Sequence, residues 1–345
     1  MSRTVPSESA TAAAASPAGG SAASGPLRVR LIDANELCFE VHERLPAHDP
    51  APSRLALFLH GFPEHAHAWR HQLPVLAALG YRAWAVNLRG YGRSSRPPRV
   101  FDYRLEVLLE DVAGLIDASG AKETVLIAHD WGAVIAWYFA IRRLRPLQRL
   151  VIMNVPHPGP MARELRNNPE QRRRSWYALF FQLPLLPEKL LGRDGARRIG
   201  EIFASGTVHP GRVAAEDAGV FARNAAQPGA LKAMIDYYRA LGLGGGSRRQ
   251  QTLGLTPIDV PTLMLWGLQD QALTEACTWG TGDWVRNLTL RYLPQASHWV
   301  QQDEPEWVNT MLDAFLSERP VPHADGAIGD LDPEPEAQPA VAGRG

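Results

Sequence analysis

The sequence predicts a doubly wound α/β fold, in which a mostly parallel sheet carries an inserted helical domain. Three observations predict this class. Short apolar runs without polar alternation are typical of parallel strands that are covered on both faces, helical periodicity appears between these runs, and one long helical stretch interrupts the alternation. The apolar runs are residues 55–59, 82–86, 124–128, 150–153 and 262–266.

The remaining elements follow from the same two periodicities. Residues 27–33 and 37–42 predict a hairpin at one edge of the sheet, and residues 288–293 predict the last strand. Apolar residues at helical spacing predict helices over residues 105–116, over 131–143, and over 308–316 after Pro305. Strands that alternate with helices in this way indicate a sheet with helices on both faces.

The alternation stops between residues 158 and 257, a stretch that is rich in arginine and has helical patterning. Because ligands of open α/β sheets bind at the carboxyl ends of the strands, we expect this insertion to form a cap there. The core is then predicted in two parts, residues 27–157 and 258–319. Residues 1–26, mostly Ala, Ser, Gly and Pro, and the Pro-rich acidic residues 320–345 are predicted to be disordered.

Composition excludes several classes of protein. The 345 residues are 45% hydrophobic, and 36 Lys and Arg balance 36 Asp and Glu, so there is no general electrostatic attraction to nucleic acid or to an anionic membrane. No apolar run approaches the roughly 18 residues that a membrane span requires. Two cysteines are too few for a disulfide framework or a structural zinc site, and this favours a reducing compartment. We therefore expect a soluble cytoplasmic protein without a nucleic-acid partner or a membrane span, and the sequence leaves the oligomeric state open.

The strongest chemical signal is the sequence AHDWG at residues 128–132, between a buried strand and a helix. This is the strand–turn–helix setting of a nucleophile elbow, with Asp130 where many hydrolases have serine. Small residues at positions 128 and 132 would allow the tight turn, and Asp tolerates the positive φ that such a turn requires. The helix amino terminus would keep the carboxylate ionised. The alternative is that Asp130 is an ordinary helix N-cap.

A second signal is HGFPE at residues 60–64, directly after the strand at 55–59. In the predicted fold this loop directs a backbone N–H toward the nucleophile, so we assign the N–H groups of Phe62 and Trp131 to an oxyanion hole. His60 and Pro63 are expected to line the substrate pocket. Glycine and proline after a strand also make simple turns, and that interpretation stays open.

The base and its acid follow by elimination. In this fold the chain order is nucleophile, acid, histidine. Only His298 and His323 follow the strand at 262–266, and His323 lies in the predicted tail, so His298 is the candidate base. Asp270 follows the same strand and is the candidate orienting acid. Asn154 occupies the other position that could hold the acid, but an amide cannot supply a full negative charge.

Together these motifs resemble the α/β-hydrolase superfamily, and within it the epoxide hydrolases, which share an Asp nucleophile with the haloalkane dehalogenases. The resemblance covers residues 27–318, and one departure is Ala128, where the family usually has glycine. The motifs occur in order as HGFP (60–63), RGYGRS (89–94), HDWG (129–132), NVPHP (154–158), WGLQD (266–270) and the His298 segment.

The resemblance implies two cap tyrosines that hold the epoxide oxygen. The matching contexts are SWYALFFQ at 175–182 and IDYYR at 235–239, so the roles fall to Tyr177 and Tyr238, although a slip of one residue would exchange Tyr238 with Tyr237. Cap aromatics also serve in core packing. The expected apolar pocket is lined by His60, Pro63, Trp131, Trp176, Phe180 and Phe181.

A carboxylate nucleophile suits displacement at a saturated carbon, because attack on an ester would leave an unstable anhydride. We therefore expect Asp130 to open a small hydrophobic epoxide to a vicinal diol through a covalent ester, which water activated by His298 then hydrolyses. No metal or organic cofactor is expected. A dehalogenase, with the indoles of Trp131 and Trp176 as halide donors, is the nearest alternative, and a non-catalytic ligand-binding protein is an alternative of another class.

Overall fold

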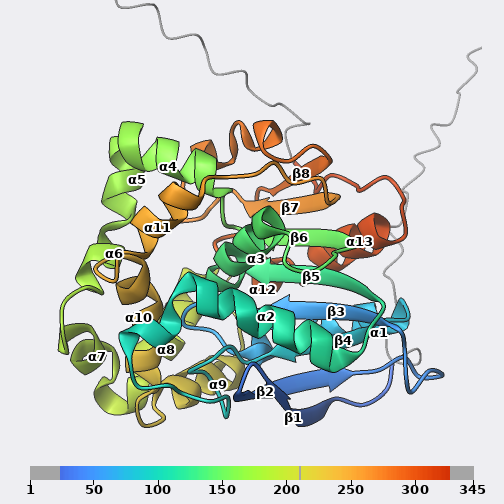
Figure 1. Cartoon of the computed structure of the whole chain (residues 1–345), viewed down its shortest axis with the longest axis horizontal. Helices are drawn as coiled ribbons and strands as arrows, with labels where there is room; N and C mark the ends of the chain where they lie inside the picture. Colours follow the sequence, from blue (N-terminus) through green and yellow to red (C-terminus); the bar gives the residue numbers. More distant parts are fainter. Residues whose placement is uncertain (1–23, 210, 327–345) are drawn as a thin grey trace, which may run out of the picture.

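The computed structural model describes residues 24–209 and 211–326, and these form a layered α/β structure around one sheet of eight strands (Figure 1). The strands lie in the order β1-β2-β4-β3-β5-β6-β7-β8. Their bounds are β1 Arg28–Ala34, β2 Leu37–Arg44, β3 Arg54–Leu59, β4 Arg82–Val86, β5 Glu123–His129, β6 Arg149–Met153, β7 Thr262–Gly267 and β8 Leu288–Leu293.

The strand directions confirm the predicted class. The hairpin β1–β2 pairs antiparallel at one edge, and β2 also pairs antiparallel with β4. All other neighbours are parallel. β3 pairs with β4 on one side and with β5 on the other, so the direction of winding reverses at β3. In sheets of this kind the crevice at the carboxyl ends of such strands is where ligands bind.

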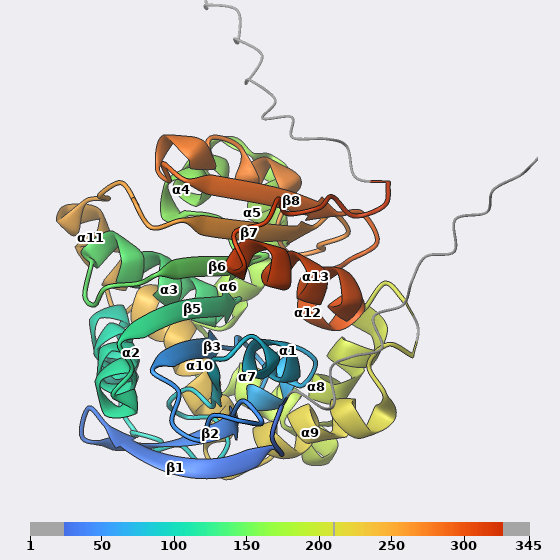
Figure 2. The same ribbon diagram turned by 90° about the vertical axis from the view of Figure 1, so that its right-hand side faces the viewer.

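Helices cover both faces of the sheet, and each face has its own apolar core. One cluster joins α2 (Leu105–Ser119) and α3 (Trp131–Arg142) to the sheet, and the other joins α1 (Leu73–Ala78) and α13 (Pro305–Leu316) to its opposite face. The two layers are seen on either side of the strands in Figure 2. The strand β3 alternates between the clusters, since Leu55, Leu57 and Leu59 belong to the first and Ala56 and Phe58 to the second.

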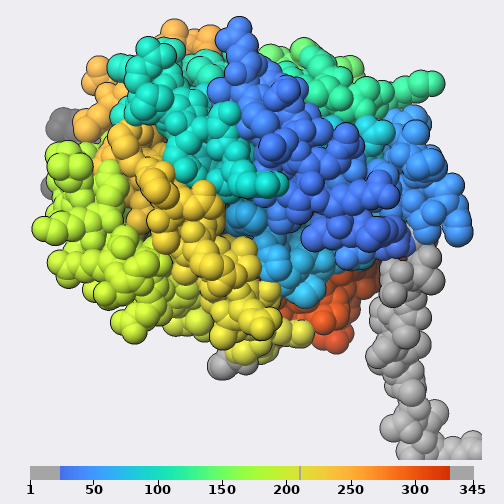
Figure 3. All heavy atoms as spheres, turned by 90° about the horizontal axis from the view of Figure 1, so that it is seen from below, coloured from blue at the N-terminus to red at the C-terminus, as the bar shows by residue number. Residues whose placement is uncertain are grey.

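The insertion between β6 and β7 consists of eight helices within the described residues. In Figure 1 it lies beyond the carboxyl ends of the parallel strands. Figure 3 shows its yellow residues packed against the cyan residues of the core, where Arg96 donates to the carbonyl of Pro228 at 2.9 Å. The insertion helices are α4 Pro158–Asn167, α5 Pro169–Arg174, α6 Trp176–Phe180, α7 Leu186–Leu191, α8 Arg193–Gly206, α9 Ala215–Ala225, α10 Ala230–Leu241 and α11 Gly246–Leu253.

Short helices complete the described chain. None of the helices in residues 24–209 and 211–326 has the length and apolar character that a membrane crossing requires. The short elements are η1 Ala66–Trp69, η2 Val100–Tyr103, η3 Glu275–Thr278, η4 Thr281–Asp283 and α12 Val300–Asp303.

The two segments predicted to be disordered overlap the described residues at positions 24–26 and 320–326. The prediction for residues 1–26 and 320–345 falls largely outside the described residues, but its inner ends are ordered parts of the fold. Ser24 forms a β-bridge with Pro46, and Gly25 N–H donates to the Leu45 carbonyl at 2.8 Å. At the other end Val321 and Ala324 are buried in the second apolar cluster. Composition alone predicted disorder there, because it does not register the few apolar side chains that find a place in a core.

Candidate active site

Asp130 lies in the tight turn between β5 and α3, at φ 47° and ψ −124°. Two glycines make this turn possible. A side chain at Gly132 would collide with the carbonyl oxygens of Leu59 and His60, and one at Gly61 would collide with the Asp130 side chain itself. The carboxylate therefore lies directly on the backbone of the loop after β3. Strain of this kind is typical of functional residues that the surrounding structure holds in place.

The two carboxylate oxygens of Asp130 face different partners. One accepts a hydrogen bond from Phe62 N–H at 2.5 Å, and the other lies 3.5 Å from Nε2 of His298. The side chain is 17% exposed. Burial raises the pKa of Asp130, but the hydrogen bond and charge of His298, the charge of His129 and the Phe62 N–H together bring that pKa below its usual value. Asp130 is thus held ionised.

His298 follows β8 and is oriented by Asp270, which follows β7. Nδ1 of His298 lies 2.7 Å from Oδ2 of Asp270. The other oxygen of Asp270 accepts N–H bonds from Ala272 at 2.7 Å and from Leu273 at 2.9 Å. Burial lowers the pKa of His298, but the Asp270 and Asp130 carboxylates outweigh burial and raise it well above the usual value. The three predicted residues therefore come together from three separate loops.

Asn154 supports the acid instead of replacing it. Its Nδ2 donates to Oδ2 of Asp270 at 2.9 Å, and its Oδ1 accepts from Gly267 N–H at 2.9 Å. The two positions that sequence analysis weighed against each other are thus in contact. The Asn154 amide, with His298 and the Leu273 N–H, brings the pKa of the buried Asp270 below its usual value although burial raises it.

The predicted oxyanion donors surround the same carboxylate. Phe62 N–H already points at Asp130, and Trp131 is the first residue of α3, where a backbone N–H has no partner within the helix. His60 is fully buried, with Nδ1 2.9 Å from the Gly61 carbonyl and Nε2 accepting from Leu88 N–H at 3.2 Å. Both nitrogens of His60 therefore hold the loop, and neither is available to a substrate. Pro63 is buried beside them.

Sequence analysis missed a buried ion pair behind the nucleophile. Glu64 is fully buried and accepts from four donors: Gly61 N–H, His129 Nδ1, and the amides of Gln301 and Gln302, at 2.8–3.1 Å. Nε2 of His129 lies 2.8 Å from the carbonyl oxygen of His298. The two ring nitrogens of His129 therefore connect the Glu64 carboxylate to the backbone of His298. Glu64 and His129 stand in the quoted motifs, but their contact is not readable from spacing.

The insertion places aromatic rings on the other side of Asp130. The ring of Tyr238 lies 5.0 Å from that of Trp131, 5.5 Å from Phe62 and 6.1 Å from Tyr177. Burial raises the pKa of both tyrosines, and the charge of Asp130 raises it further. Both tyrosines are therefore protonated donors at neutral pH.

Tyr237 differs from its neighbour. Its hydroxyl donates to the backbone carbonyl of Arg89 at 2.8 Å, and its ring packs against those of Tyr91 and Tyr103. This side chain belongs to the joint between α10 and the core. Tyr237 and Tyr238 both contact the Trp131 ring, at 5.5 and 5.0 Å, but the Tyr237 hydroxyl is already bonded to the core, and the assignment of the second donor to Tyr238 stays a prediction.

The predicted pocket aromatics divide into two groups. Phe181 is buried and contacts Phe62 and Tyr238, with ring centroids 5.1 and 4.8 Å apart. Phe180 lies against Phe181 at 5.7 Å. Trp176 is 62% exposed and contacts Phe180, so it is not enclosed in the site as the prediction had it. Helical position explains this difference, because α6 is one short turn and cannot bury all of its aromatic faces.

Helix α5 is fastened to the loop that carries the acid. The Arg174 guanidinium donates to the Asp270 carbonyl oxygen at 2.7 Å. The buried Gln171 donates to the carbonyl of Ala272 at 3.0 Å and accepts from Thr274 N–H at 2.8 Å. These bonds connect the insertion to the core within a few residues of both Tyr177 and Asp270.

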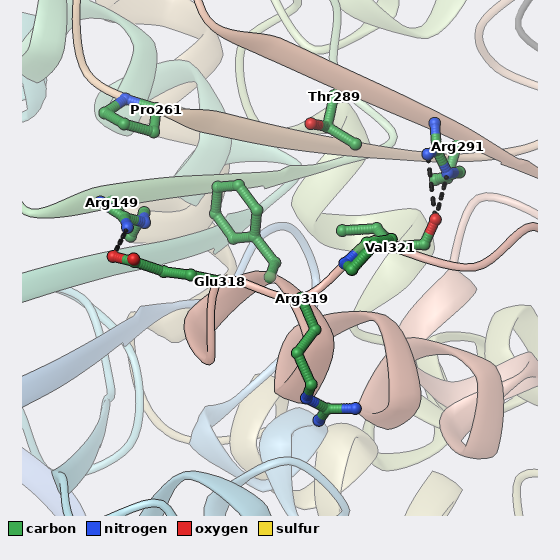
Figure 4. A pocket seen from close by; sticks show the side chains of 9 residues that line it. Arg149, Pro261, Thr289, Arg291, Glu318, Arg319 and Val321 are labelled. Carbon is green, nitrogen blue, oxygen red and sulfur yellow. Dashed lines mark hydrogen bonds and ion pairs between the residues drawn. The ribbon is translucent and has the colours of Figure 1, made fainter.

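A separate hollow of about 520 Å³ lies at the amino ends of β6–β8, at the opposite edge of the sheet (Figure 4). Arg149, Arg291 and Arg319 line it. Arg149 is paired with Glu318 at 2.6 Å, and Arg291 donates to the Val321 carbonyl at 3.0 Å. Because these guanidiniums are already bonded and the catalytic groups are at the other edge, we assign no chemistry to this hollow.

The arrangement combines an ionised carboxylate that accepts from the Phe62 N–H, an imidazole oriented by a second carboxylate, and two tyrosines of the insertion whose rings pack beside these groups. It can therefore support nucleophilic attack by Asp130, protonation of a leaving oxygen, and activation of a water molecule by His298. No part of the arrangement resembles a phosphate-binding loop, which would present consecutive N–H groups of a glycine-rich turn.

Comparison with known proteins agrees with this geometry. The family model described as alpha/beta hydrolase fold matches residues 57–305. Epoxide hydrolase 3 of Xenopus tropicalis is 38% identical over 269 residues, which are 76% of this chain and 71% of that protein. Epoxide hydrolase 4 of Mus musculus is 35% identical over 269 residues, which are 76% of this chain and 73% of its own.

A similar fold is found in a solved variant of the epoxide hydrolase from Bacillus megaterium, in complex with its product, a naphthyloxy-propane-1,2-diol. Its TM-score is 0.74 at 30% sequence identity, and the match covers 84% of this chain and all of that chain.

Proposed function

The chain belongs to the alpha/beta hydrolase family and, within it, to the epoxide hydrolases, and from this premise we propose that it opens epoxides through a covalent ester on Asp130. One observation carries the proposal. The Asp130 carboxylate lies between the Phe62 N–H at 2.5 Å and His298 Nε2 at 3.5 Å, and the Tyr238 ring packs on the rings of Phe62 and Trp131 beside it.

In the first step a carboxylate oxygen of Asp130 attacks one carbon of the epoxide, and the bond between that carbon and the epoxide oxygen breaks. Tyr177 and Tyr238 donate hydrogen bonds to this oxygen, which leaves as an alkoxide and takes up a proton. The donors matter because an alkoxide is a poor leaving group, and positioned acids contribute about 10²–10⁴-fold in rate. The product of this step is a hydroxyalkyl ester of Asp130.

In the second step His298, oriented by Asp270, removes a proton from a water molecule that attacks the carbonyl carbon of the ester. The negative oxygen of the tetrahedral intermediate accepts from the N–H groups of Phe62 and Trp131. Collapse of the intermediate breaks the acyl–oxygen bond, and the departing oxygen takes the proton that His298 removed from water, which releases a vicinal diol. The proton that the Asp130 carboxylic acid then loses to solvent balances the proton taken up in the first step. Formation of the ester removes the negative charge of Asp130, which lowers the pKa of His298 and makes it a base at that moment.

The halide-releasing alternative has less support. It needs two N–H donors on a departing halide, and the sequence offered the indoles of Trp131 and Trp176. Trp176 is 62% exposed, and its ring contacts Phe180, which supports a halide donor less than a buried indole would. The non-catalytic alternative requires a broken triad, whereas Asp130, His298 and Asp270 are bonded in series.

The substrates that fit are lipophilic epoxides, with aryl substituents among them, because Phe62, Phe181 and Tyr238 present an aromatic wall to Asp130. Water is the second substrate. We also propose the cytoplasm as the location, on the basis that Cys38 and Cys277 are both free thiols.

A single turnover in heavy-oxygen water tests the covalent route. Enzyme in excess over a styrene-oxide-type epoxide should release a first diol whose added oxygen is unlabelled, because that oxygen comes from Asp130. The label should then appear in the peptide that contains Asp130. Label in the first diol, with none in the peptide, would overturn the covalent mechanism, and halide release from a haloalkane without diol formation would overturn the choice of substrate.

A further inference from the structure

Large apolar side chains are exposed in one short stretch of the insertion. Of the twelve such side chains in the described residues, six lie between positions 165 and 186. Five of these belong to α6, to α7 and to the turn between the two helices, and we refer to them as the α6–α7 surface: Trp176, Leu179, Leu183, Leu185 and Leu186. Leu179 and Leu185 are 76% and 78% exposed. Apolar patches of this kind mark interaction sites on soluble proteins.

The turn that exposes this surface contains an unfavourable backbone conformation. Leu185 has φ 63°, a left-handed conformation that is unfavourable for a leucine. The buried guanidinium of Arg239 donates to the carbonyl oxygens of Phe181 at 3.1 Å and of Leu183 at 2.6 Å, and it also binds Glu188 at 2.6 Å. The leucines are therefore presented by a turn that is fixed from beneath, and not by a loose loop.

Positive charge is concentrated in the stretch of the sequence that carries this surface. Residues 163–198 contain nine Lys or Arg against four Asp or Glu, an excess of five in a chain whose total charge is zero. Exposed basic side chains without an ion pair to any described residue are Arg166, Arg172, Arg173, Lys189, Arg193 and Arg198. The neutral composition of the whole chain thus conceals a local basic region.

The surface lies at the outer margin of the molecule and leads to the site. In Figure 1, α5, α6 and α7 run along the side that is farthest from the sheet. From there the rings of Trp176, Phe180 and Phe181 follow one another at 5.8 and 5.7 Å, and Phe181 contacts Phe62, whose N–H binds Asp130. An unbroken row of aromatic rings therefore connects the exposed surface to the nucleophile.

We propose that the α6–α7 surface docks on the interface of an anionic lipid bilayer. Leucines and a tryptophan on an outward turn are the side chains that enter the boundary between headgroups and acyl chains, and the surrounding arginines suit anionic headgroups. Docking in this way needs no membrane-crossing helix. If the protein acts on lipophilic epoxides, as proposed above, the row of rings would begin where such molecules concentrate.

A second copy of the chain fits this surface less well. A two-fold contact would place the basic border of one copy against the same border of the other, and like charges at an interface oppose association. A bilayer that contains acidic lipids offers the opposite charge over an extended area.

Vesicle flotation with the full chain tests the proposal. We expect the protein to float with phosphatidylcholine vesicles that contain about one-third phosphatidylserine, and to bind pure phosphatidylcholine about tenfold more weakly. The double variant Leu179→Ser/Leu185→Ser should lose about tenfold in affinity for the acidic vesicles. Leu31→Ser, a leucine that is 53% exposed on β1, is the matched control and should bind as the unchanged chain does.

Two further variants separate docking from folding. Leu185→Gly removes the side chain and relieves the left-handed strain, so it should raise the melting temperature and yet weaken vesicle binding. Arg172→Gln/Arg173→Gln should reduce binding to acidic vesicles without changing turnover of a water-soluble epoxide. That turnover is measured for every variant, so that an error in the proposed function is distinguished from an error in the docking surface.

Three results would overturn the proposal. One is no flotation of the unchanged chain with acidic vesicles. Another is flotation that Leu185→Gly and the double variant leave unaltered. The third is a dimer in sedimentation velocity that the same variants dissociate, without vesicle binding, which would make this face a contact between copies of the chain.

Discussion

The two sides of Asp130 differ in the kind of contact that they provide, which is polar on the core side and aromatic on the insertion side. On the core side, polar atoms are matched with partners: Glu64 accepts from four donors, and both oxygens of Asp270 are bonded. On the insertion side the neighbours are the rings of Phe181, Tyr177 and Tyr238, which contact one another at centroid distances of 4.8–6.1 Å. One side is a network of charges and hydrogen bonds, and the other is an apolar wall with two hydroxyl groups.

This difference shows how the two tasks of the reaction are divided. The core side must keep a carboxylate ionised and an imidazole oriented, and fixed partners do this without reorganisation during the reaction. The insertion side must accept an apolar substrate and leave a hydroxyl donor for its oxygen. Substitutions on the core side should therefore affect either covalent step, both of them or the fold, whereas those on the insertion side should affect the first step alone.

The largest effect is expected from Asp130→Asn. An amide is not a nucleophile toward a saturated carbon, so turnover should fall by about 10⁴-fold or more while the melting temperature changes little. Diol formation by chromatography and thermal unfolding by circular dichroism measure the two quantities. Residual turnover of several per cent, in protein free of deamidation, would show that another group attacks the epoxide.

A slightly smaller effect is expected from His298→Gln. The ester should still form, but its hydrolysis should slow by about 10³-fold, because no base activates the water. Mass spectrometry of the intact protein should then show an added mass of one substrate molecule. Normal turnover by this variant would mean that a different residue is the base.

The two adjacent tyrosines test the insertion side. Tyr238→Phe should slow ester formation by about 10- to 100-fold, with Tyr177 remaining as a donor, and should leave ester hydrolysis unchanged. Tyr237→Phe is the matched control, since it removes the same atom from a hydroxyl that binds the Arg89 carbonyl. We expect this control to lose about 1 kcal/mol of stability and little activity. The reverse pattern in stopped-flow measurements would exchange the two assignments.

Glu64→Gln tests the core side behind the nucleophile. The substitution removes a buried carboxylate that accepts from four donors, which we expect to cost about 3 kcal/mol in the free energy of unfolding and about tenfold in both covalent steps. Glu43→Gln is the control, because Glu43 on β2 is also buried but binds Trp84 on β4 and Arg30 on β1. An equal loss of activity in both variants would show that Glu64 acts only through general stability.

The smallest effect concerns the ionisation of His298. Burial lowers its pKa and the carboxylates of Asp270 and Asp130 raise it, so removal of the Asp130 charge should lower it. The imidazole resonances of Asp130→Asn should accordingly titrate at lower pH than those of the unchanged chain in nuclear magnetic resonance spectra. Because the folded-state pKa is raised, the stabilisation that protonated His298 provides is complete below its usual pKa and is lost as pH rises through the folded-state value. An unchanged titration would show that Asp130 does not face the ring.

Much of the framework could be predicted from the sequence because its signals are local. The apolar runs predicted the parallel strands within one residue at most ends, and residues 288–293 form β8 as predicted. The tight turn at Asp130 was predicted for the same reason, since small residues between a strand and a helix leave few other conformations.

Contacts between distant residues were not predictable in this way. Whether Tyr237 or Tyr238 faces Asp130 depends on the rotation of α10 about its axis, and a change of one residue turns a helical side chain by about 100°. The exposure of Trp176 and the burial of Val321 likewise depend on what packs beside them. The pairing of Glu64 with His129 joins two loops that are 65 residues apart.

The attachment of α5 to the loop of Asp270 limits how this enzyme can admit its substrate. Arg174 donates to the backbone carbonyl of Asp270. Gln171 binds the backbone of Ala272 and of Thr274 in the same loop. A movement of α5 away from the core would draw the Asp270 carboxylate away from His298. The imidazole would then lose the group that orients it. Substrate entry that leaves the triad intact therefore has to proceed past the end of the insertion that is distant from α5, while α5 stays bonded to the Asp270 loop.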